Sequence, residues 1–199
     1  MIFGDKSVFA VESTLTKAYA RVSLRALGFF VIHIGGRSYG VRSPDATMLA
    51  CSFDAVHDRI ERRGTHIAAF ATHGTADKIA EAFRESIYSA DRETKKFFGF
   101  SQRAFSEMFY SNQLIWAPDG DQAFDDGSYV LQFDVMDRVR LIAFKATKSQ
   151  GYDSDTLGDV WIEADQFYVI LQRWWHAFEA EWVAAVRGAN GARSQERIS

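Results

Sequence analysis

Two side chains at helical spacing are the first candidates for chemistry in this sequence. His57 and Glu61 are four residues apart, so a helix through this segment would place both on one face, where they could bind a metal ion or transfer a proton. The same spacing is common on solvated helices, and the charged residues Asp58, Arg59 and Arg62 surround the pair. We therefore interpret this segment as a solvated helix face and not as a site.

The other histidines and acidic clusters lack the spacing of a metal site. His66 and His73 have no third ligand at a recognisable interval. The Asp-Ser-Asp triplet at 153–155 resembles the start of a calcium loop, but residues 157–159 do not keep the register that an EF-hand requires. The single cysteine, Cys51, excludes cysteine-based zinc clusters and is expected to be buried for packing. We predict no metal site.

Motifs for nucleotide binding and nucleophilic catalysis are also missing. The sequence contains no Gly-x-Gly-x-x-Gly, no Walker-type loop and no nucleophile elbow, and Gly35-Gly36 fits a turn better than a phosphate cradle. We therefore predict no catalytic residue and no cofactor. Two alternatives stay open: an enzyme acting on a small molecule, with a site built from residues distant in sequence, and an intracellular regulatory or scaffold protein.

The charge distribution is the most informative feature of the sequence. The net charge is −3 and the sequence pI is about 6.0, which argues against a nucleic-acid-binding protein. Between Ala117 and Gln166, eleven acidic residues stand against four basic ones, so this segment carries −7 and the rest of the chain +4. Many of these acids fall in predicted turns, where they would be exposed. An exposed acidic surface attracts and selects a basic partner.

We predict that a partner protein binds this acidic segment through two loops, Asp119 to Asp126 and Asp153 to Asp159, with nearby aromatic side chains as anchors. The alternative is that turns are rich in Asp in any protein. The predicted partner-binding residues are Asp119, Asp121, Phe124, Asp125, Asp126, Tyr152, Asp153, Asp155 and Asp159.

Strands are predicted at both ends of the sequence. Residues 8–11, the alternating segment 19–27 and the apolar segment 29–34 read as strands, and Gly35-Gly36 indicates a hairpin into residues 37–41. Later in the chain, residues 129–135 and 139–146 both alternate and predict an antiparallel hairpin, followed by a polar loop at 150–158 and a short strand at 160–162. A short strand is also possible at 65–72.

Helices are predicted between and after these strands. One begins near Ser52 or Asp54 and ends at Gly64, the next is capped by Thr75, and another covers part of 97–110. A long helix runs from Asp165 to Gly188, with Trp174 and Trp182 on its apolar face. Trp175 lies off that face and could be an exposed anchor or pack under a loop.

The resulting fold class is α+β, a mainly antiparallel sheet with helices packed on it and a long C-terminal helix. Residues 1–188 form a single domain and residues 189–199 a disordered tail. The first residues lack the pattern of a signal peptide, and the longest apolar stretches are far shorter than the ~20 residues that span a bilayer. We expect a cytoplasmic protein without a membrane partner.

Two segments resemble a known family. The opening Met-Ile-Phe-Gly-Asp-Lys-Ser-Val-Phe-Ala-Val-Glu at 1–12 is similar to the start of the family 42 immunity proteins of bacterial polymorphic toxin and contact-dependent growth inhibition systems. The segment from Asp159 to Trp174 is similar in character to their endings. The resemblance implies a small protein, without enzymatic activity, that binds and neutralises a cognate toxin domain. Gly4 and Asp5 would then form a turn that seats the first strand.

Overall fold

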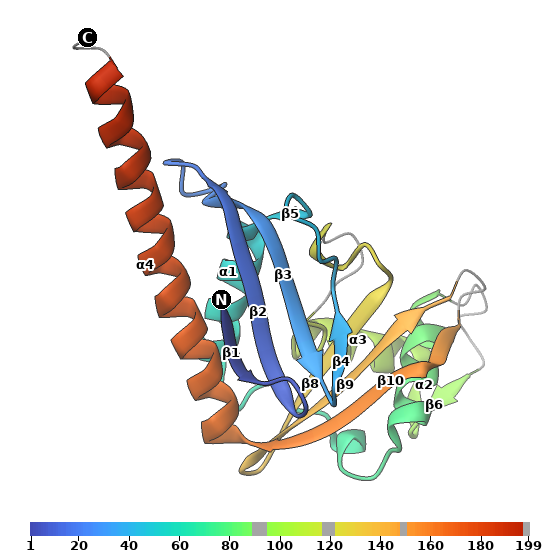
Figure 1. Ribbon diagram of the computed structural model, residues 1–199. Helices are drawn as coiled ribbons and strands as arrows, with labels where there is room; N and C mark the ends of the chain where they lie inside the picture. Colours follow the sequence, from blue (N-terminus) through green and yellow to red (C-terminus); the bar gives the residue numbers. More distant parts are fainter. Residues whose placement is uncertain (89–94, 117–121, 148–150, 197–199) are drawn as a thin grey trace.

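The computed structural model describes residues 1–88, 95–116, 122–147 and 151–196, with the backbone alone for 190–196. Two larger antiparallel sheets, a two-stranded ribbon, four α-helices and two short 3-10 helices make up the described part of the chain (Figure 1), which confirms the α+β class. The strands are β1 (Ile2–Asp5), β2 (Phe9–Ala18), β3 (Ala26–Ile34), β4 (Arg37–Tyr39), β5 (Thr47–Met48), β6 (Lys96–Phe97), β7 (Phe100–Ser101), β8 (Ser128–Val135), β9 (Arg138–Ala146) and β10 (Tyr152–Glu163). The helices are α1 (Leu49–Glu61), η1 (Ala69–Ala71), α2 (Ala76–Tyr88), α3 (Gln102–Ser111), η2 (Gln122–Phe124) and α4 (Ala164–Glu196).

The strands form a five-stranded and a three-stranded sheet, beside a two-stranded ribbon of β6 and β7. The larger sheet has the order β1-β2-β3-β4, with β5 pairing β3, and the smaller one has the order β10-β9-β8. The alternation of β9 divides its side chains between two apolar clusters. Leu141 and Ala143 point into a core shared with the larger sheet, α1 and α4, whereas Ile142 and Phe144 point into a second core shared with α2 and α3. The three-stranded sheet is therefore the middle layer of the molecule.

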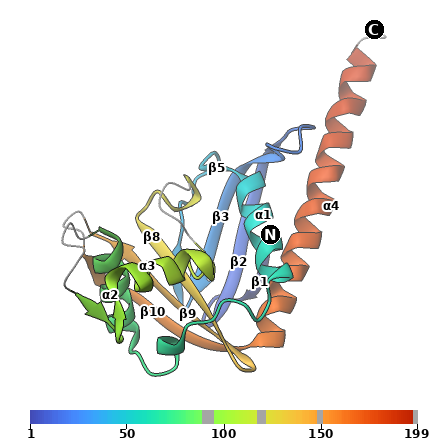
Figure 2. The same ribbon diagram turned by 180° about the vertical axis from the view of Figure 1, so that it is seen from behind.

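Helices cover the sheets on the side seen in Figure 2. There, α1 lies over the larger sheet, and α2 and α3 lie over the three-stranded sheet. The helix α4 runs along the edge of the larger sheet near β1, and its C-terminal part extends beyond the body of the molecule in both views. In the part of the chain that the structure describes, no helix has the length and apolar character needed to cross a membrane.

The hairpin signals in the sequence are confirmed. Gly35 and Gly36 join β3 to β4 with φ values of +58° and +79°, and β8 and β9 form the predicted antiparallel pair. Gly4 sits in β1 with φ of +102°, where a Cβ would approach the carbonyl oxygen of Phe9 to 2.3 Å. Only glycine fits this position, so the Gly4-Asp5 pair does have a structural role at the first hairpin.

The first strands differ from the prediction. Residues 19–25, read as part of a strand, form the turn between β2 and β3, and Arg25 has a positive φ of 51° there. The strand β2 instead runs from Phe9 to Ala18, with residues 9–13 buried and Thr16 and Lys17 exposed near its end. The possible strand at 65–72 is also wrong, because that segment contains only the 3-10 turn η1.

The first helix begins earlier than predicted. Its N-terminus lies at Leu49 and not after Ser52 or Asp54, and its N-cap residue Met48 offers no side-chain cap. This start turns Leu49 and Phe53 inward and Cys51 outward, so the prediction that Cys51 is buried is wrong. Thr75 does cap α2, since its hydroxyl accepts a hydrogen bond of 3.4 Å from the N–H of Lys78.

The strand β10 and the helix α4 both extend further than predicted. Residues 152–158, read as a loop, belong to β10. The pairing with β9 is irregular there, because five residue steps on β10, from Asp153 to Gly158, lie opposite two steps on β9, from Lys145 to Ala143. The helix α4 continues through Gly188 to Glu196 and so includes part of the segment expected to be disordered. A helical glycine costs about 1 kcal/mol relative to Ala, and the neighbouring Ala184, Ala185 and Ala189 favour the helix.

Candidate partner-binding surface

The two acidic segments predicted from the sequence meet at one end of the three-stranded sheet. Lys145, near the end of β9, joins them. Its Nζ lies 2.6 Å from Oδ2 of Asp126, just before β8, and its backbone pairs with that of Asp153 on β10. Because β8 and β10 flank β9, carboxylates that are far apart in sequence lie at the same end of the sheet.

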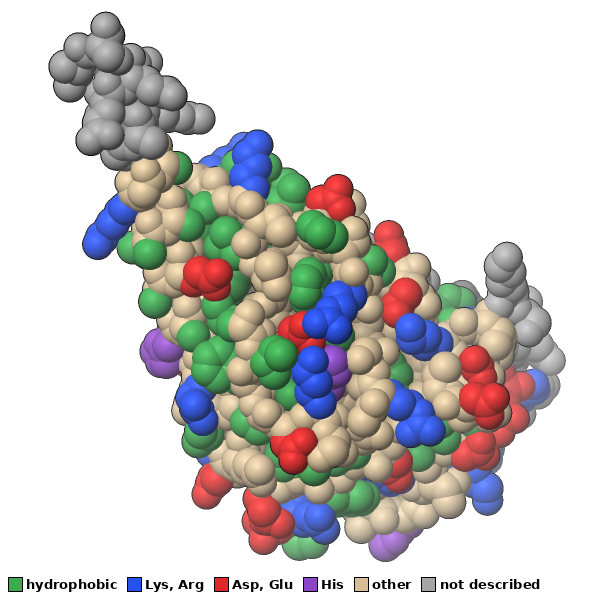
Figure 3. Space-filling view, in the orientation of Figure 1, with side chains coloured by type: hydrophobic (Ala, Val, Ile, Leu, Met, Phe, Trp, Pro, Cys, Tyr) green, Lys and Arg blue, Asp and Glu red, His purple; other side chains and the backbone are tan. Residues whose placement is uncertain are grey.

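The helix α2 adds two acidic side chains that the sequence analysis missed. The Tyr152 hydroxyl, at the start of β10, donates a hydrogen bond to Oδ1 of Asp77. Burial raises the pKa of Tyr152, and the negative charges of Asp77 and Glu81 raise it further. These contacts bring the first turns of α2 beside β10. Figure 3 shows acidic side chains gathered along the edge of the molecule where β10 and α2 lie.

We call this surface the acidic end. It is formed by Asp77, Glu81, Asp125, Asp126, Asp153 and Asp155.

Most of the acidic end is open to solvent. Asp77, Asp125, Asp153 and Asp155 are exposed, and no ion pair to any of them occurs within the described ranges. The Asp153 side chain accepts a hydrogen bond of 3.0 Å from the N–H of Asp155, which holds this part of β10 in a fixed turn. Unpaired, exposed carboxylates keep their long-range field and can attract a basic partner.

Basic side chains reduce the charge of the acidic end without cancelling it. Lys145 pairs with Asp126, whose side chain is 22% exposed. Arg37 donates a hydrogen bond of 3.2 Å from its Nε to the backbone oxygen of Asp155, and Lys78 is exposed on α2 beside Asp77. Among the described residues, six carboxylates therefore stand against these three cations.

Two of the predicted residues do not belong to this surface. Phe124 is only 5% exposed and packs edge-on against Phe30 at a centroid distance of 6.3 Å, so it is a core residue and not a surface anchor. Asp159 forms a two-pronged ion pair with the buried Arg140, at 2.9 and 2.8 Å. Tyr152 is half-buried, and Asp119 and Asp121 lie outside the described residues.

Replacing Asp159 by Ala is expected to affect stability far more than partner binding. Arg140 also donates hydrogen bonds of 2.7 Å to the carbonyl oxygens of Ala71 and Gly74, and loss of Asp159 would leave its guanidinium without a counter-charge. Because Asp159 is one-third exposed, we expect a loss of about 1–3 kcal/mol, less than for a fully buried pair. Urea unfolding measures this loss, with Asp155→Ala as the exposed control. A change below about 0.5 kcal/mol would show that the pair is not structural.

The histidines do not form a metal centre. His57 and Glu61 approach to 4.0 Å on α1, where Glu61 is exposed and the His57 ring lies 5.2 Å from that of Trp175. The solvated-face interpretation is wrong for Arg59 of the same segment, which is 5% exposed. His66 is buried, and its Nδ1 lies 3.1 Å from the backbone oxygen of Asn112. Among residues 1–88, 95–116, 122–147 and 151–196, no three His, Cys, Asp or Glu side chains are placed to hold a metal ion.

A polar chain on the larger sheet has the order of a catalytic triad but a different environment. His33 lies 3.0 Å from the Ser38 hydroxyl through Nδ1 and 2.9 Å from Glu12 through Nε2. Glu12 is itself bound by Lys6 at 2.7 Å and by Arg42, so two cations already neutralise its charge. The chain therefore connects β2, β3 and β4 with the flanking loops, which is a structural task.

Comparisons with known proteins identify a solved structure with a similar fold and a matching protein family. A crystal structure of CdiI from Burkholderia dolosa AUO158 is similar to it with a TM-score of 0.55 and 16% identity, over 87% of this chain and 97% of that one. At this identity the likeness concerns the fold alone. No curated protein matches the sequence. The family described as Immunity protein 42 matches residues 1–177, from β1 into α4. The chain belongs to the immunity protein 42 family.

Proposed function

We propose that this protein binds a cognate bacterial toxin domain and neutralises it. The observation that carries the proposal is the family match over residues 1–177, which includes both sheets and the first three helices. The fold shared with CdiI from Burkholderia dolosa is consistent with it. Neutralisation requires only a tight complex, so it fits a chain in which the sequence offers no catalytic or cofactor motif.

The acidic end is our proposed contact for the toxin. Asp125, Asp126, Asp153 and Asp155, together with Asp77 and Glu81, present a negative surface on the turn before β8, the strand β10 and the helix α2. A nuclease has a basic cleft because it binds phosphates, and an acidic inhibitor can occupy such a cleft. The proposed partner is therefore a basic toxin domain, with nuclease activity as the specific hypothesis. A standard interface of about 1,600 Å² would be large enough for tight binding.

Co-expression tests the proposal. A candidate toxin domain, taken from a reading frame adjacent to that of this chain, is produced in a bacterial host with and without the chain, and survival and complex formation are both measured. Rescue of growth together with co-purification of the two proteins is the expected result. Cell death despite folded immunity protein in the lysate would contradict the proposal and favour an enzymatic or regulatory role.

A further inference from the structure

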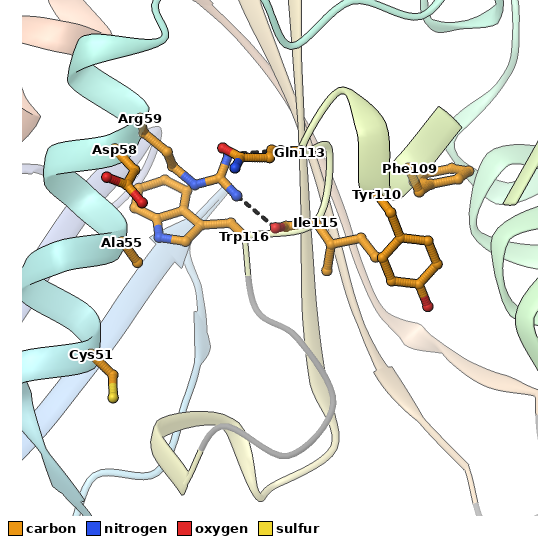
Figure 4. Close-up of a pocket in the computed structure, with 9 residues that line it drawn as sticks. All are labelled: Cys51, Ala55, Asp58, Arg59, Phe109, Tyr110, Gln113, Ile115 and Trp116. Atoms are coloured by element: carbon orange, nitrogen blue, oxygen red, sulfur yellow. Dashed lines mark hydrogen bonds between the residues drawn. The ribbon is translucent and has the colours of Figure 1, made fainter. Parts of the chain in front are cut away.

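A pocket lies between α1 and α3, away from the acidic end. Its volume is about 340 Å³, and residues of α1, α3 and the segment that follows α3 line it. Figure 4 shows the α1 side chains on one wall, Tyr110 on the opposite wall, and Ile115 and Trp116 between them. This volume is within the range of cavities that accept one large side chain or a small ligand.

The floor of the pocket is fixed by a buried guanidinium. Arg59 is 5% exposed and donates hydrogen bonds to Ile115 O at 2.6 Å, Gln113 O at 3.3 Å and Gln132 Oε1 at 3.0 Å. Its guanidinium also lies over the ring of Trp116, 5.0 Å from the centroid. These contacts hold the segment after α3 against α1, so the pocket exists before a ligand arrives. A preformed pocket loses less conformational entropy on binding.

The walls of the pocket are apolar and its mouth carries an exposed aromatic ring. Ala55, Phe109, Ile115 and Trp116 line the walls, and Tyr110 is 62% exposed at the mouth. Tyrosine is enriched among residues that dominate binding energy because it offers a rigid, amphipathic surface. An exposed Tyr beside an apolar hollow is therefore suited to hold an inserted side chain.

The charges around the pocket select its occupant. Asp58 lines the pocket and is exposed, and no ion pair of it occurs among the described residues. Asp54 and Glu61 are exposed elsewhere on α1, where Asp54 lies 3.8 Å from Arg25 and Glu61 lies 4.0 Å from His57. Burial lowers the pKa of Arg59 to about 9, so this side chain is still positively charged at neutral pH. The positive floor disfavours a cation inside the pocket, whereas the exposed Asp58 attracts a cation beside the pocket. The complementary ligand is an apolar side chain flanked by Lys or Arg.

We propose that this pocket receives an apolar anchor side chain of the basic toxin domain, with a flanking basic residue of the toxin against Asp58. This inference rests on the proposed function, because the occupant is the toxin. It assigns different tasks to the two surfaces. The acidic end accelerates encounter with the toxin, and the pocket slows its release, since buried anchors act mainly on dissociation.

Cysteine protection tests the pocket in the unmodified protein. Cys51 lines the pocket, is exposed, and is the only cysteine among 199 residues, so N-ethylmaleimide modifies this position alone. We expect saturating toxin domain to slow the modification of Cys51 at least tenfold. An equal modification rate in the free chain and in a proven complex would overturn the pocket proposal and leave the toxin-binding function intact.

Two substitutions give a kinetic test of the same proposal. Tyr110→Ala and Ala55→Trp are each expected to speed dissociation of the toxin tenfold or more, with association changed less than threefold. Ala184→Trp is the matched control, because Ala184 is exposed on α4. Thermal unfolding of each variant shows whether the fold is kept, and Tyr110→Ala removes only an exposed ring.

The outcomes of this kinetic test separate the possible explanations. Unchanged dissociation in both folded variants would contradict the pocket proposal. A change in self-association in place of toxin release would show that a second copy of this chain occupies the pocket, which also overturns it. Absence of toxin binding by the wild-type chain would refute the proposed function and the pocket together.

Discussion

Replacing Asp125, Asp126, Asp153 and Asp155 together by Asn slows association with the toxin domain by about ten- to a hundredfold at low ionic strength. The reason is that these carboxylates meet at one end of the three-stranded sheet, where Asp125, Asp153 and Asp155 have no ion pair within the described ranges. Stopped-flow or biolayer measurements at about 50 mM and 500 mM salt would show the effect, which should shrink at high salt because the field is screened.

A control with the same change in net charge separates local from overall electrostatics. Asp45→Asn, Asp137→Asn, Glu179→Gln and Glu181→Gln also remove four negative charges, but from loops and from α4. We expect this variant to associate within about threefold of the wild-type rate. Equal slowing in both variants would assign the effect to net charge. An unchanged rate and an unchanged salt dependence in the first variant would contradict a role for the acidic end.

Replacing Trp174 by Ala lowers the free energy of unfolding by about 3–5 kcal/mol. Trp174 is fully buried where α4 meets the larger sheet, stacked on Phe178 at 5.4 Å and edge-on to Phe30 at 5.1 Å. Its Nε1 donates a hydrogen bond of 2.9 Å to the Ser13 hydroxyl, so the substitution creates a cavity and also removes a buried hydrogen bond. Urea unfolding followed by circular dichroism measures the loss.

Trp182 provides the comparison for this prediction. It is half-buried and lies further along α4 than Trp174, and its Nε1 donates a hydrogen bond of 2.9 Å to the backbone oxygen of Tyr19. Trp182→Ala is expected to cost about 1–2 kcal/mol because its ring already contacts water. A loss for Trp174→Ala no larger than that for Trp182→Ala would contradict the packing described for α4.

Local patterns predicted the parts of the fold in which one face is buried. The alternation in residues 129–135 and 139–146 predicted the β8–β9 hairpin, and steps of three and four predicted α4 with Trp174 in the core. The same alternation misled at residues 19–25, where the side chains alternate in a turn whose Tyr19 carbonyl accepts a hydrogen bond from Trp182 within α4. Periodicity reports side-chain polarity, and only long-range packing decides whether such a segment is a strand.

The acidic end was only partly predictable for a similar reason. Counting charges identified residues 117–166, and turn signals indicated that Asp125 and Asp153 are exposed. No local signal placed Asp77 and Glu81 beside Tyr152, because the position of α2 depends on its packing against the three-stranded sheet. Nor did the sequence show that Arg140 would bind Asp159, since that pairing follows from the register of β9 and β10.

The surroundings of Trp175 also depend on long-range packing that the local sequence pattern did not determine. Its place off the main apolar face of α4 allowed either an exposed anchor or a packed ring. The structure stacks it on Phe53 of α1 at 4.9 Å, with His57 at 5.2 Å, so it joins two helices that are far apart in sequence. Among the described residues, the most exposed aromatic side chain is instead Tyr110, which no pattern in the sequence distinguished from the other aromatics around it.

Calorimetric titration of the purified toxin domain with this protein tests the central claim most directly. The proposed function predicts one-to-one binding with a dissociation constant in the nanomolar range or below, weakened as salt is raised from about 50 to 500 mM. Absence of binding heat at two temperatures, with both proteins folded, would contradict the claim that this chain neutralises the toxin by binding it.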